Sequence, residues 1–386
     1  MSIDTIYLDY AAATPIDERV VAVMQPYFAT EFYNPSSPYR QAVEVRRDYE
    51  AAKQQIAMTI GAKGDELIMT AGATESINLA FNHVKGHVVT SEIEHPAVIE
   101  VAKLRDHTLV GANEQGRISL ESIEAALRPD TELVSIGLAN SELGTIQPLR
   151  KIAEVIERER QKRAEQGNMT PLLFHSDASQ GFGQIDVNTA RLGVDMLTLN
   201  AAKIYGPKQV GLLWLKPSVH LTPTVVGGGQ ERGLRSGTEN VAGTIGFAMA
   251  AKLAAKSRTS ENERLSSLRG KLEALLVEQF PQAVVTGSKK HRLPGHLHIS
   301  FPGIDAERII FMLENQNILV ATGSACSANK GTASHVLRAL ALGEEIINGS
   351  LRLTLGRNTS ESHVRTAAEE ITKAVRAEYQ RMEQAV

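Results

Sequence analysis

The sequence contains a single cysteine, Cys326, among 386 residues, and no long apolar run. One cysteine excludes an intramolecular disulfide bond and a multi-cysteine zinc site, so we expect no metal centre. Any functional role of Cys326 would therefore be that of a free thiol. The chain also has no apolar stretch of the roughly eighteen residues that a membrane-spanning helix needs. These absences exclude a disulfide-stapled scaffold and a helical membrane protein.

The chain also has little excess of either charge, because its formal net charge is only -3. A nearly neutral chain lacks the basic surface typical of nucleic-acid-binding proteins. The first ten residues have neither a basic start nor an apolar core, so we expect no secretory signal and a cytoplasmic location. With 42% hydrophobic residues, a chain of this length can bury a large core and favours two domains.

Strand-like segments alternate with helical ones through the first half of the chain. The predicted strands cover residues 66–70, 87–91, 133–139, 172–175 and 194–199. Because amphipathic helical patterns separate these segments, we expect an α/β fold with a mainly parallel sheet that is covered on both faces.

An alanine-rich helix over 240–256 and a second helix over 260–279 are expected to lead into a smaller α+β domain. We therefore place a large domain at 15–255 and a small domain at 1–14 together with 256–386.

Polar side chains follow the carboxyl ends of several predicted strands. They are Glu94 and His95, Asn140 and Glu142, Asp177 and Gln180, and Lys203. Since the carboxyl ends of parallel strands meet at one edge of a sheet, where α/β folds bind ligands, we expect a site there. Chance alone would not place such residues in four separate loops.

Lys203 directly follows the apolar segment 194–199. Burial among apolar or cationic groups lowers a lysine pKa enough to make the amine a nucleophile, which suits Schiff-base chemistry. The small-residue turn 71–74 lies between the first strand of the alternation and a helix expected to begin near Glu75. A turn of this type exposes backbone N–H groups at a helix amino end, so it is a candidate phosphate site.

Two features of the expected small domain also indicate reactive or ligand-binding side chains. Cys326 lies in a run of small and polar residues with Lys330 nearby, which favours a reactive thiolate on a mobile loop over a buried, inert thiol. The leucines of residues 351–355 alternate with Arg352 and Thr354, so Arg352 faces away from the leucines and could pair with a carboxylate.

Together these stretches resemble the cysteine desulfurases, pyridoxal-phosphate enzymes of the aminotransferase class V group, and most closely the housekeeping type that supplies iron-sulfur cluster assembly. The resemblance covers nearly the whole chain. Its motifs are YLDYAA at 7–12, GATE at 72–75, EH at 94–95, NSELG at 140–144, DASQ at 177–180, KIYGPK at 203–208, RSGT at 235–238, GSAC at 323–326 and LR at 351–352. It implies fold type I of the pyridoxal-phosphate-dependent transferases.

The resemblance also implies a role for each matched residue. The implied catalytic residues are Lys203, Cys326 and His95. The implied ligands of the cofactor phosphate are Ala73 and Thr74, with Thr238 from the second subunit of a homodimer. On the cofactor ring, His95 would stack, Asn140 and Gln180 would bind the phenolic oxygen, and Asp177 would bind the ring nitrogen. Lys203 would attach the cofactor covalently, and Asn200 is a further implied cofactor ligand. Asn34 and Arg352 would hold the substrate carboxylate.

By this resemblance the reaction converts L-cysteine to L-alanine and leaves the sulfur as a persulfide on Cys326. The acceptor would be a protein such as an iron-sulfur scaffold or a tRNA-thiolation enzyme. The family usually has Ser-x-His-Lys at the lysine, whereas this chain has Asn200-Ala-Ala202-Lys203, so one phosphate donor is missing. The alternatives are a selenocysteine lyase or another class V enzyme, for which Cys326 would be dispensable, and a sulfur carrier or scaffold with a decayed cofactor site.

Overall fold

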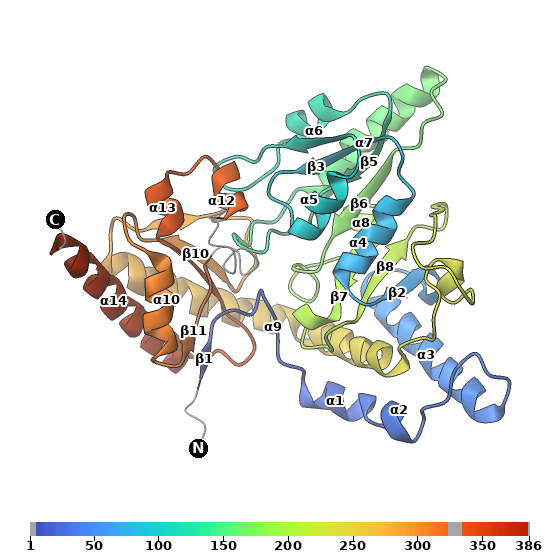
Figure 1. Ribbon diagram of the computed structural model, residues 1–386, viewed down its shortest axis with the longest axis horizontal. Helices are drawn as coiled ribbons and strands as arrows, with labels where there is room; N and C mark the ends of the chain where they lie inside the picture. Colours follow the sequence, from blue (N-terminus) through green and yellow to red (C-terminus); the bar gives the residue numbers. More distant parts are fainter. Residues whose placement is uncertain (1–4, 323–333, 385–386) are drawn as a thin grey trace.

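A seven-stranded sheet forms the centre of the larger part of the computed structural model, which describes residues 5–322 and 334–384 (Figure 1). In spatial order the strands are β2 (Leu67–Thr70), β8 (Gly211–Leu215), β7 (Met196–Asn200), β6 (Leu173–Asp177), β5 (Thr131–Ser135), β3 (His87–Ser91) and β4 (His107–Val110). Only the two pairings of β8 are antiparallel. The mainly parallel sheet predicted from the alternation is therefore confirmed.

Helices cover both faces of this sheet, as expected. Side chains of α4 (Ala73–Asn82) and α5 (Pro96–Ala102) pack with Val88 and Leu133 on one face. Side chains of α3 (Arg40–Thr59), α7 (Leu149–Glu165) and α9 (Val241–Gln279) pack with Val134 and Phe174 on the other. The shorter elements of this region are α1 (Glu18–Met24), α2 (Pro26–Ala29), η1 (Gly64–Glu66), α6 (Leu120–Ala126), α8 (Thr189–Leu192), η2 (Ala201–Lys203) and η3 (Glu231–Gly233).

The rest of the chain has a separate core around a three-stranded antiparallel sheet. The order of its strands is β12 (Ser350–Thr354), β10 (His296–Ser300) and β9 (Val284–Thr286). Strand β1 (Ile6–Tyr7) pairs in parallel with β11 (Ile318–Leu319), which brings the beginning of the described chain to this region. The helices are α10 (Ala306–Glu314), α12 (His335–Ala339), α13 (Glu344–Asn348) and α14 (Glu361–Glu383).

The two helices expected over 240–256 and 260–279 are one continuous helix, α9, so that expectation is wrong. Between Lys256 and Ser260 the chain has neither proline nor glycine to interrupt the backbone hydrogen bonds. The apolar pattern stops because α9 packs in one core as far as Ala254 and enters the other core only at Leu265. We propose that the boundary between the domains at 15–255 and 256–386 lies within this helix, with residues 1–14 joined to the second domain.

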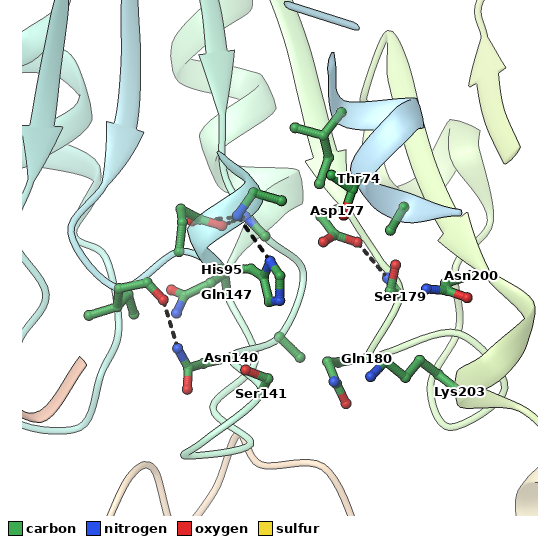
Figure 2. Close-up of a pocket in the computed structure, with 17 residues that line it drawn as sticks. Thr74, His95, Asn140, Ser141, Gln147, Asp177, Ser179, Gln180, Asn200 and Lys203 are labelled. Carbon is green, nitrogen blue, oxygen red and sulfur yellow. Dashed lines mark hydrogen bonds between the residues drawn. The ribbon is translucent and has the colours of Figure 1, made fainter. Parts of the chain in front are cut away.

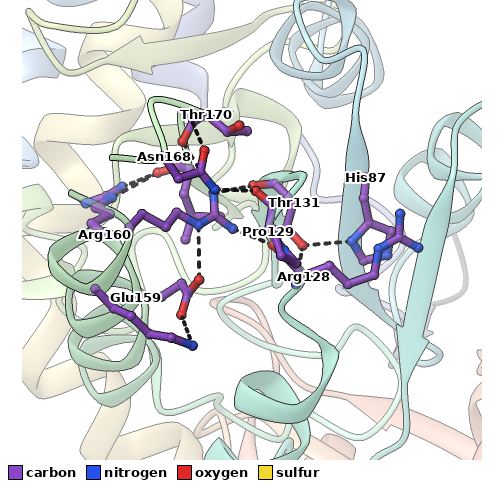
Figure 3. Close-up of polar contacts among 11 residues, drawn as sticks. His87, Arg128, Pro129, Thr131, Glu159, Arg160, Asn168 and Thr170 are labelled. Carbon is purple, nitrogen blue, oxygen red and sulfur yellow. Dashed lines mark hydrogen bonds and ion pairs between the residues drawn. The ribbon is translucent and has the colours of Figure 1, made fainter. Parts of the chain in front are cut away.

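A buried arginine fixes the amino edge of the central sheet. Arg163 of α7 is only 3% exposed, and it donates to the backbone carbonyls of Thr131 (2.8 Å) and Arg128 (2.6 Å). Its Nε donates to Glu159 one turn earlier on the helix (3.1 Å). Figure 3 shows Glu159 on the helix side of this network and Thr131 on the strand side. These bonds hold α7 against the start of β5.

Among the described residues, α9 and α14 are the longest helices. Neither they nor any other helix in that part of the chain combines the length and apolar character of a membrane span.

Candidate active site

A cavity of about 190 Å³ lies at the carboxyl edge of the central sheet (Figure 2). Its walls come from the β2–α4 turn, the β3–α5 loop, the loop after β5, the end of β6 and the β7–η2 turn, so the parallel strands bring distant segments together. Eight of the residues predicted as cofactor ligands line it: Ala73, Thr74, His95, Asn140, Asp177, Gln180, Asn200 and Lys203.

Lys203 enters the cavity from η2, directly after β7, as its position after an apolar strand predicted. Its Nζ donates to the backbone carbonyls of Ala11 (2.8 Å) and Ala12 (2.7 Å). Gln180 also donates to the Ala11 carbonyl, from Nε2 at 3.0 Å. The segment after β1 therefore passes beside Lys203 and positions the amine next to the cavity.

The amino end of α4 opens into the same cavity through Ala73 and Thr74. The helix begins at Ala73, two residues earlier than predicted, because Gly72 adopts a φ of 142° that residues other than glycine rarely reach. No side chain caps this end. Its first N–H groups and the helix dipole therefore remain available for an anion in the cavity.

Asp177, at the end of β6, presents a half-buried carboxylate to the cavity. Its Oδ1 accepts from the backbone N–H of Ser179 (2.9 Å), which fixes the orientation of the carboxylate. The Ser179 hydroxyl also lines the cavity, and it is buried without a hydrogen-bond partner among the residues that the structure describes. A buried hydroxyl of this kind is normally satisfied by a ligand or by water, so it indicates that the cavity holds a polar molecule.

His95 extends into the cavity from the start of α5, and Figure 2 shows its ring beside Gln147. Its Nδ1 accepts from the backbone N–H of Ala97 (3.1 Å), so the neutral ring carries its proton on Nε2. Desolvation lowers the pKa of His95, and the Lys203 charge acts in the same direction, against the opposing effect of Asp177. The ring is therefore neutral at neutral pH and can stack on a flat ligand or exchange a proton at Nε2.

Asn140 has a second role that the sequence did not indicate. Its Oδ1 accepts from the backbone N–H groups of Glu142 and Leu143 (both 2.9 Å), and its Nδ2 donates to the carbonyl of Ile93 (2.8 Å). These bonds join the loop after β5 to the loop after β3. The second hydrogen on Nδ2 remains for a ligand, because a side-chain amide has two donors.

At the lysine turn, Asn200 partly replaces the serine of the family motif. Its Oδ1 accepts from the N–H of Ala202 (3.0 Å), so its amide nitrogen is the atom left to donate into the cavity. Ala202 is half-buried and its side chain donates nothing. By the family resemblance, we therefore expect one donor to the cofactor phosphate to be missing.

We expect Ala202→His to slow the loss of pyridoxal phosphate on dialysis. A hydrogen bond to a charged group contributes roughly 1.5–3 kcal/mol, which corresponds to about a tenfold to a hundredfold gain in affinity. The measurement is the decay of the visible absorbance of the bound cofactor. Ala202→Leu is the matched control, because it adds bulk without a donor. Equal rates of cofactor loss from the histidine and leucine variants would contradict the missing-donor explanation.

Four further polar residues line the cavity that were not predicted as ligands: Glu94, Ser141, Gln147 and Ser179. Each lies within seven residues of a predicted ligand at the same strand end, and this proximity was the signal available in the sequence. Glu94 is buried and accepts from the Ser91 hydroxyl (2.7 Å) and the Gly137 N–H (3.0 and 3.1 Å). Burial raises the pKa of Glu94 to about 7.

This raised pKa predicts a pH-dependent stability for the cofactor-free protein. The folded state holds the Glu94 proton more tightly than the unfolded state, so its contribution to stability falls by about 3 kcal/mol as pH rises from about 4.5 to about 7. Glu94→Gln cannot ionise. Relative to the wild type it should gain stability between about pH 5 and about pH 8, as measured by urea unfolding. Glu92→Gln, in the same loop, is the control, and an equal gain in both variants would contradict the prediction.

The remaining predicted site residues do not line the cavity within the described chain. Arg352 is buried on β12, facing away from the leucines as predicted, and its guanidinium pairs with Asp9 (2.6 Å). Asn34 and Thr238 are exposed, and the Asn34 Oδ1 accepts from the N–H of Ser36 (2.9 Å). Cys326 lies outside the described residues. The roles of these four residues remain predictions.

The residues around the cavity fit pyridoxal phosphate. The uncapped end of α4 suits its phosphate, Asp177 suits a protonated ring nitrogen, the Lys203 amine suits its aldehyde, and the buried Ser179 hydroxyl suits a polar ligand. With the mainly parallel sheet and the smaller second core, this site defines a pyridoxal-phosphate-dependent enzyme of fold type I.

Comparison with known proteins identifies the family. The model of the aminotransferase class-V family matches residues 6–366, so the chain belongs to that family. The chain is 41% identical over 370 residues to a protein of Archaeoglobus fulgidus named cysteine desulfurase IscS 1, with 92% of this chain and 93% of the relative covered. It is 38% identical over 368 residues to cysteine desulfurase IscS of Dictyoglomus turgidum, covering 92% and 91%.

The solved structures that resemble this fold include a NifS-like protein, with a TM-score of 0.88 at 31% identity over 96% of this chain and 98% of the other. The fold class predicted from the sequence, a fold type I pyridoxal-phosphate enzyme, is therefore confirmed.

Proposed function

We propose that the protein is a pyridoxal-phosphate-dependent cysteine desulfurase that converts L-cysteine to L-alanine and transfers the sulfur. The observation that carries this function is the similarity to cysteine desulfurases over more than nine-tenths of the chain. The cavity supports it, because eight predicted cofactor ligands line its wall. The alternatives of another class V activity and of a decayed site are not favoured.

Bound pyridoxal phosphate supplies an electron sink for the negative charge that develops on the substrate Cα. We assign the other tasks to residues of the chain. Lys203 binds the cofactor aldehyde covalently and, once released, moves a proton at Cα through Nζ. The Asp177 carboxylate keeps a proton on the ring nitrogen, and the first N–H groups of α4 hold the phosphate. Arg352 and Asn34 are proposed to bind the substrate carboxylate.

The transfer of sulfur is assigned to Cys326. Its thiolate attacks the substrate sulfur, so that the Cβ–S bond breaks and an S–S bond forms. The electron pair left on the substrate carbon takes up a proton, and L-alanine leaves. The persulfide sulfur then passes to an acceptor, for which we propose a cytoplasmic protein such as an iron-sulfur scaffold or a tRNA-thiolation enzyme.

The direct test is to supply the purified protein with pyridoxal phosphate and L-cysteine and to quantify alanine together with sulfur. In the presence of a thiol reductant we expect equal amounts of alanine and sulfide. Selenocysteine serves as the comparison substrate. Absence of alanine from cysteine, or turnover of selenocysteine alone, would contradict the desulfurase.

We also propose that the protein acts as a homodimer and that Thr238 reaches the site of the other subunit. An exposed aromatic cluster supports a subunit interface: Phe28 and Phe32 are 63% and 66% exposed, and Tyr39 is 49% exposed. Tyr33 stacks on Phe32 and meets Tyr39 edge-on. Thr238 is itself exposed and lies outside the cavity of its own chain.

A buried carboxylate supports a fixed position for the loop that carries Thr238. Glu231 accepts from the Tyr49 hydroxyl (2.5 Å), from Lys53 (3.2 and 3.3 Å) and from the N–H of Met69 (2.6 Å), so the loop is tied to α3 and to the edge strand β2. A loop held in this way can present Thr238 outward.

Subunit mixing tests this arrangement. Lys203→Ala and Thr238→Val are each expected to bind cofactor poorly as homodimers. In a mixed dimer, one site would combine both changes and the other would have neither, so cofactor retention should recover in part. Recovery is not expected if Thr238 serves its own subunit, and sedimentation analysis would show whether a dimer forms at all.

A further inference from the structure

A second, smaller cavity of about 60 Å³ lies behind Lys203, between the central sheet and the second core. Lys203 and Gln180 line both this cavity and the larger one. On its other sides are Tyr10 and His296, and it also reaches Glu261 of α9. The lysine amine thus separates the cofactor cavity from a second space that the proposed chemistry does not use.

The polar groups around the lysine can accept the hydrogens of an ammonium on the side of this second cavity. The carbonyl of Ala11, which lines the second cavity, accepts from Lys203 Nζ and from Gln180 Nε2, and the carbonyl of Ala12 accepts from the same Nζ. Two carbonyl oxygens suit an ammonium, which has three donors and no acceptor. After its release from the cofactor, the amine can rest here with the proton it has taken.

His296 of β10 is the group in this cavity that needs a partner. The residue is 3% exposed, and within residues 5–322 and 334–384 both buried ring nitrogens are without a hydrogen-bond partner. Desolvation lowers the pKa of His296 to about 3, helped by the charges of Arg352, Arg292 and Lys203. The ring is therefore neutral and offers one donor and one acceptor.

Water is the partner that the cavity can supply to this ring. Buried polar groups are normally hydrogen-bonded, and a polar cavity of this size has room for more than one water molecule. The side chains of Glu261 and Asn262, which the cavity also reaches, are partly exposed, so this water can exchange with solvent.

We propose that the second cavity holds the water through which Lys203 exchanges protons with solvent, and that His296 is the positioning residue that orients this water. The proposal rests on the proposed function, in which Lys203 removes the substrate Cα proton. An N–H bond of the ammonium breaks, an O–H bond forms on the water, and the excess proton leaves along the water toward Glu261. His296 acts as donor and acceptor to the water and does not hold the proton itself.

The test uses L-cysteine with deuterium at Cα and measures total deuterium in the alanine product by mass spectrometry. In the wild type, exchange through the cavity should remove almost all of the label. In His296→Leu the cavity loses its water-binding group, so the deuteron stays on the lysine and returns to the product. Retention on the order of one third is expected, because the deuteron is one of three ammonium hydrogens.

His298 provides a matched control. It lies two residues along β10 and is also buried and without a partner in the described part of the chain, but it does not line this cavity. His298→Leu should therefore wash out the label as the wild type does. His296→Gln, which keeps a donor and an acceptor, should restore the washout. A wild type that retains the label, or a His296→Leu variant that loses it completely, would overturn the proposal.

A structural readout keeps the test independent of turnover and of the folding of the leucine variant. A high-resolution crystal structure of the cofactor-free wild type should show ordered water within hydrogen-bond distance of a His296 ring nitrogen. A dry cavity there overturns the proposal. If the wild type forms no alanine from cysteine, the desulfurase activity fails, and the crystal structure still decides whether His296 binds water.

Discussion

Replacing Lys203 by alanine is expected to abolish the visible absorbance of bound pyridoxal phosphate and to stop the formation of alanine from cysteine. The variant loses the amine that attaches the cofactor and the base that moves the Cα proton. Loss of a positioned general base alone costs on the order of 10²–10⁴-fold in rate. The absorbance spectrum after gel filtration and the initial rate of alanine formation measure the two losses separately.

Lys208→Ala is the control for this result. Lys208 belongs to the same segment and donates to the carbonyl of Thr14 (3.3 Å), but it does not line the cofactor cavity. Its replacement should leave the absorbance in place. A Lys203→Ala protein that keeps the spectrum of the wild type would show that another amine holds the cofactor, and the proposed site would be wrong.

Replacing Cys326 by alanine is expected to separate cofactor binding from sulfur transfer. The visible absorbance should remain, because the predicted role of Cys326 does not include holding the cofactor. Formation of alanine and sulfide should fall to background, because no thiolate is left to take the sulfur from the substrate. Alanine analysis and sulfide release after addition of cysteine measure the effect.

The single cysteine makes the control for this variant simple. Mass spectrometry of the wild type after cysteine treatment should show an added sulfur atom that a thiol reductant removes, and Cys326→Ser should show none. The serine variant has nearly the same shape and lacks only the thiol. Normal alanine formation by Cys326→Ala would contradict the desulfurase and would favour a class V enzyme that does not need this residue.

The sequence predicted the mainly parallel sheet because each strand that it identified is a short apolar run next to an amphipathic helix, and this pattern is local. It predicted Lys203 at the end of β7 for the same reason. The break between residues 256 and 260 misled the prediction of α9. A loss of apolar pattern resembles a loop in the sequence, whereas here it marks the stretch of one helix between two cores.

The sequence by itself determined the type of most strands and helices of the larger core, though not β4 or β8, and the chemical groups at the strand ends, since periodicity and residue type are properties of neighbouring positions. Only the tertiary structure decided how these groups meet. It assigned the polar atoms of Asn140 to the joining of two loops and buried Glu94. It also brought His296 of a distant strand behind Lys203. Such contacts depend on packing between segments far apart in the chain, and no local pattern encodes that packing.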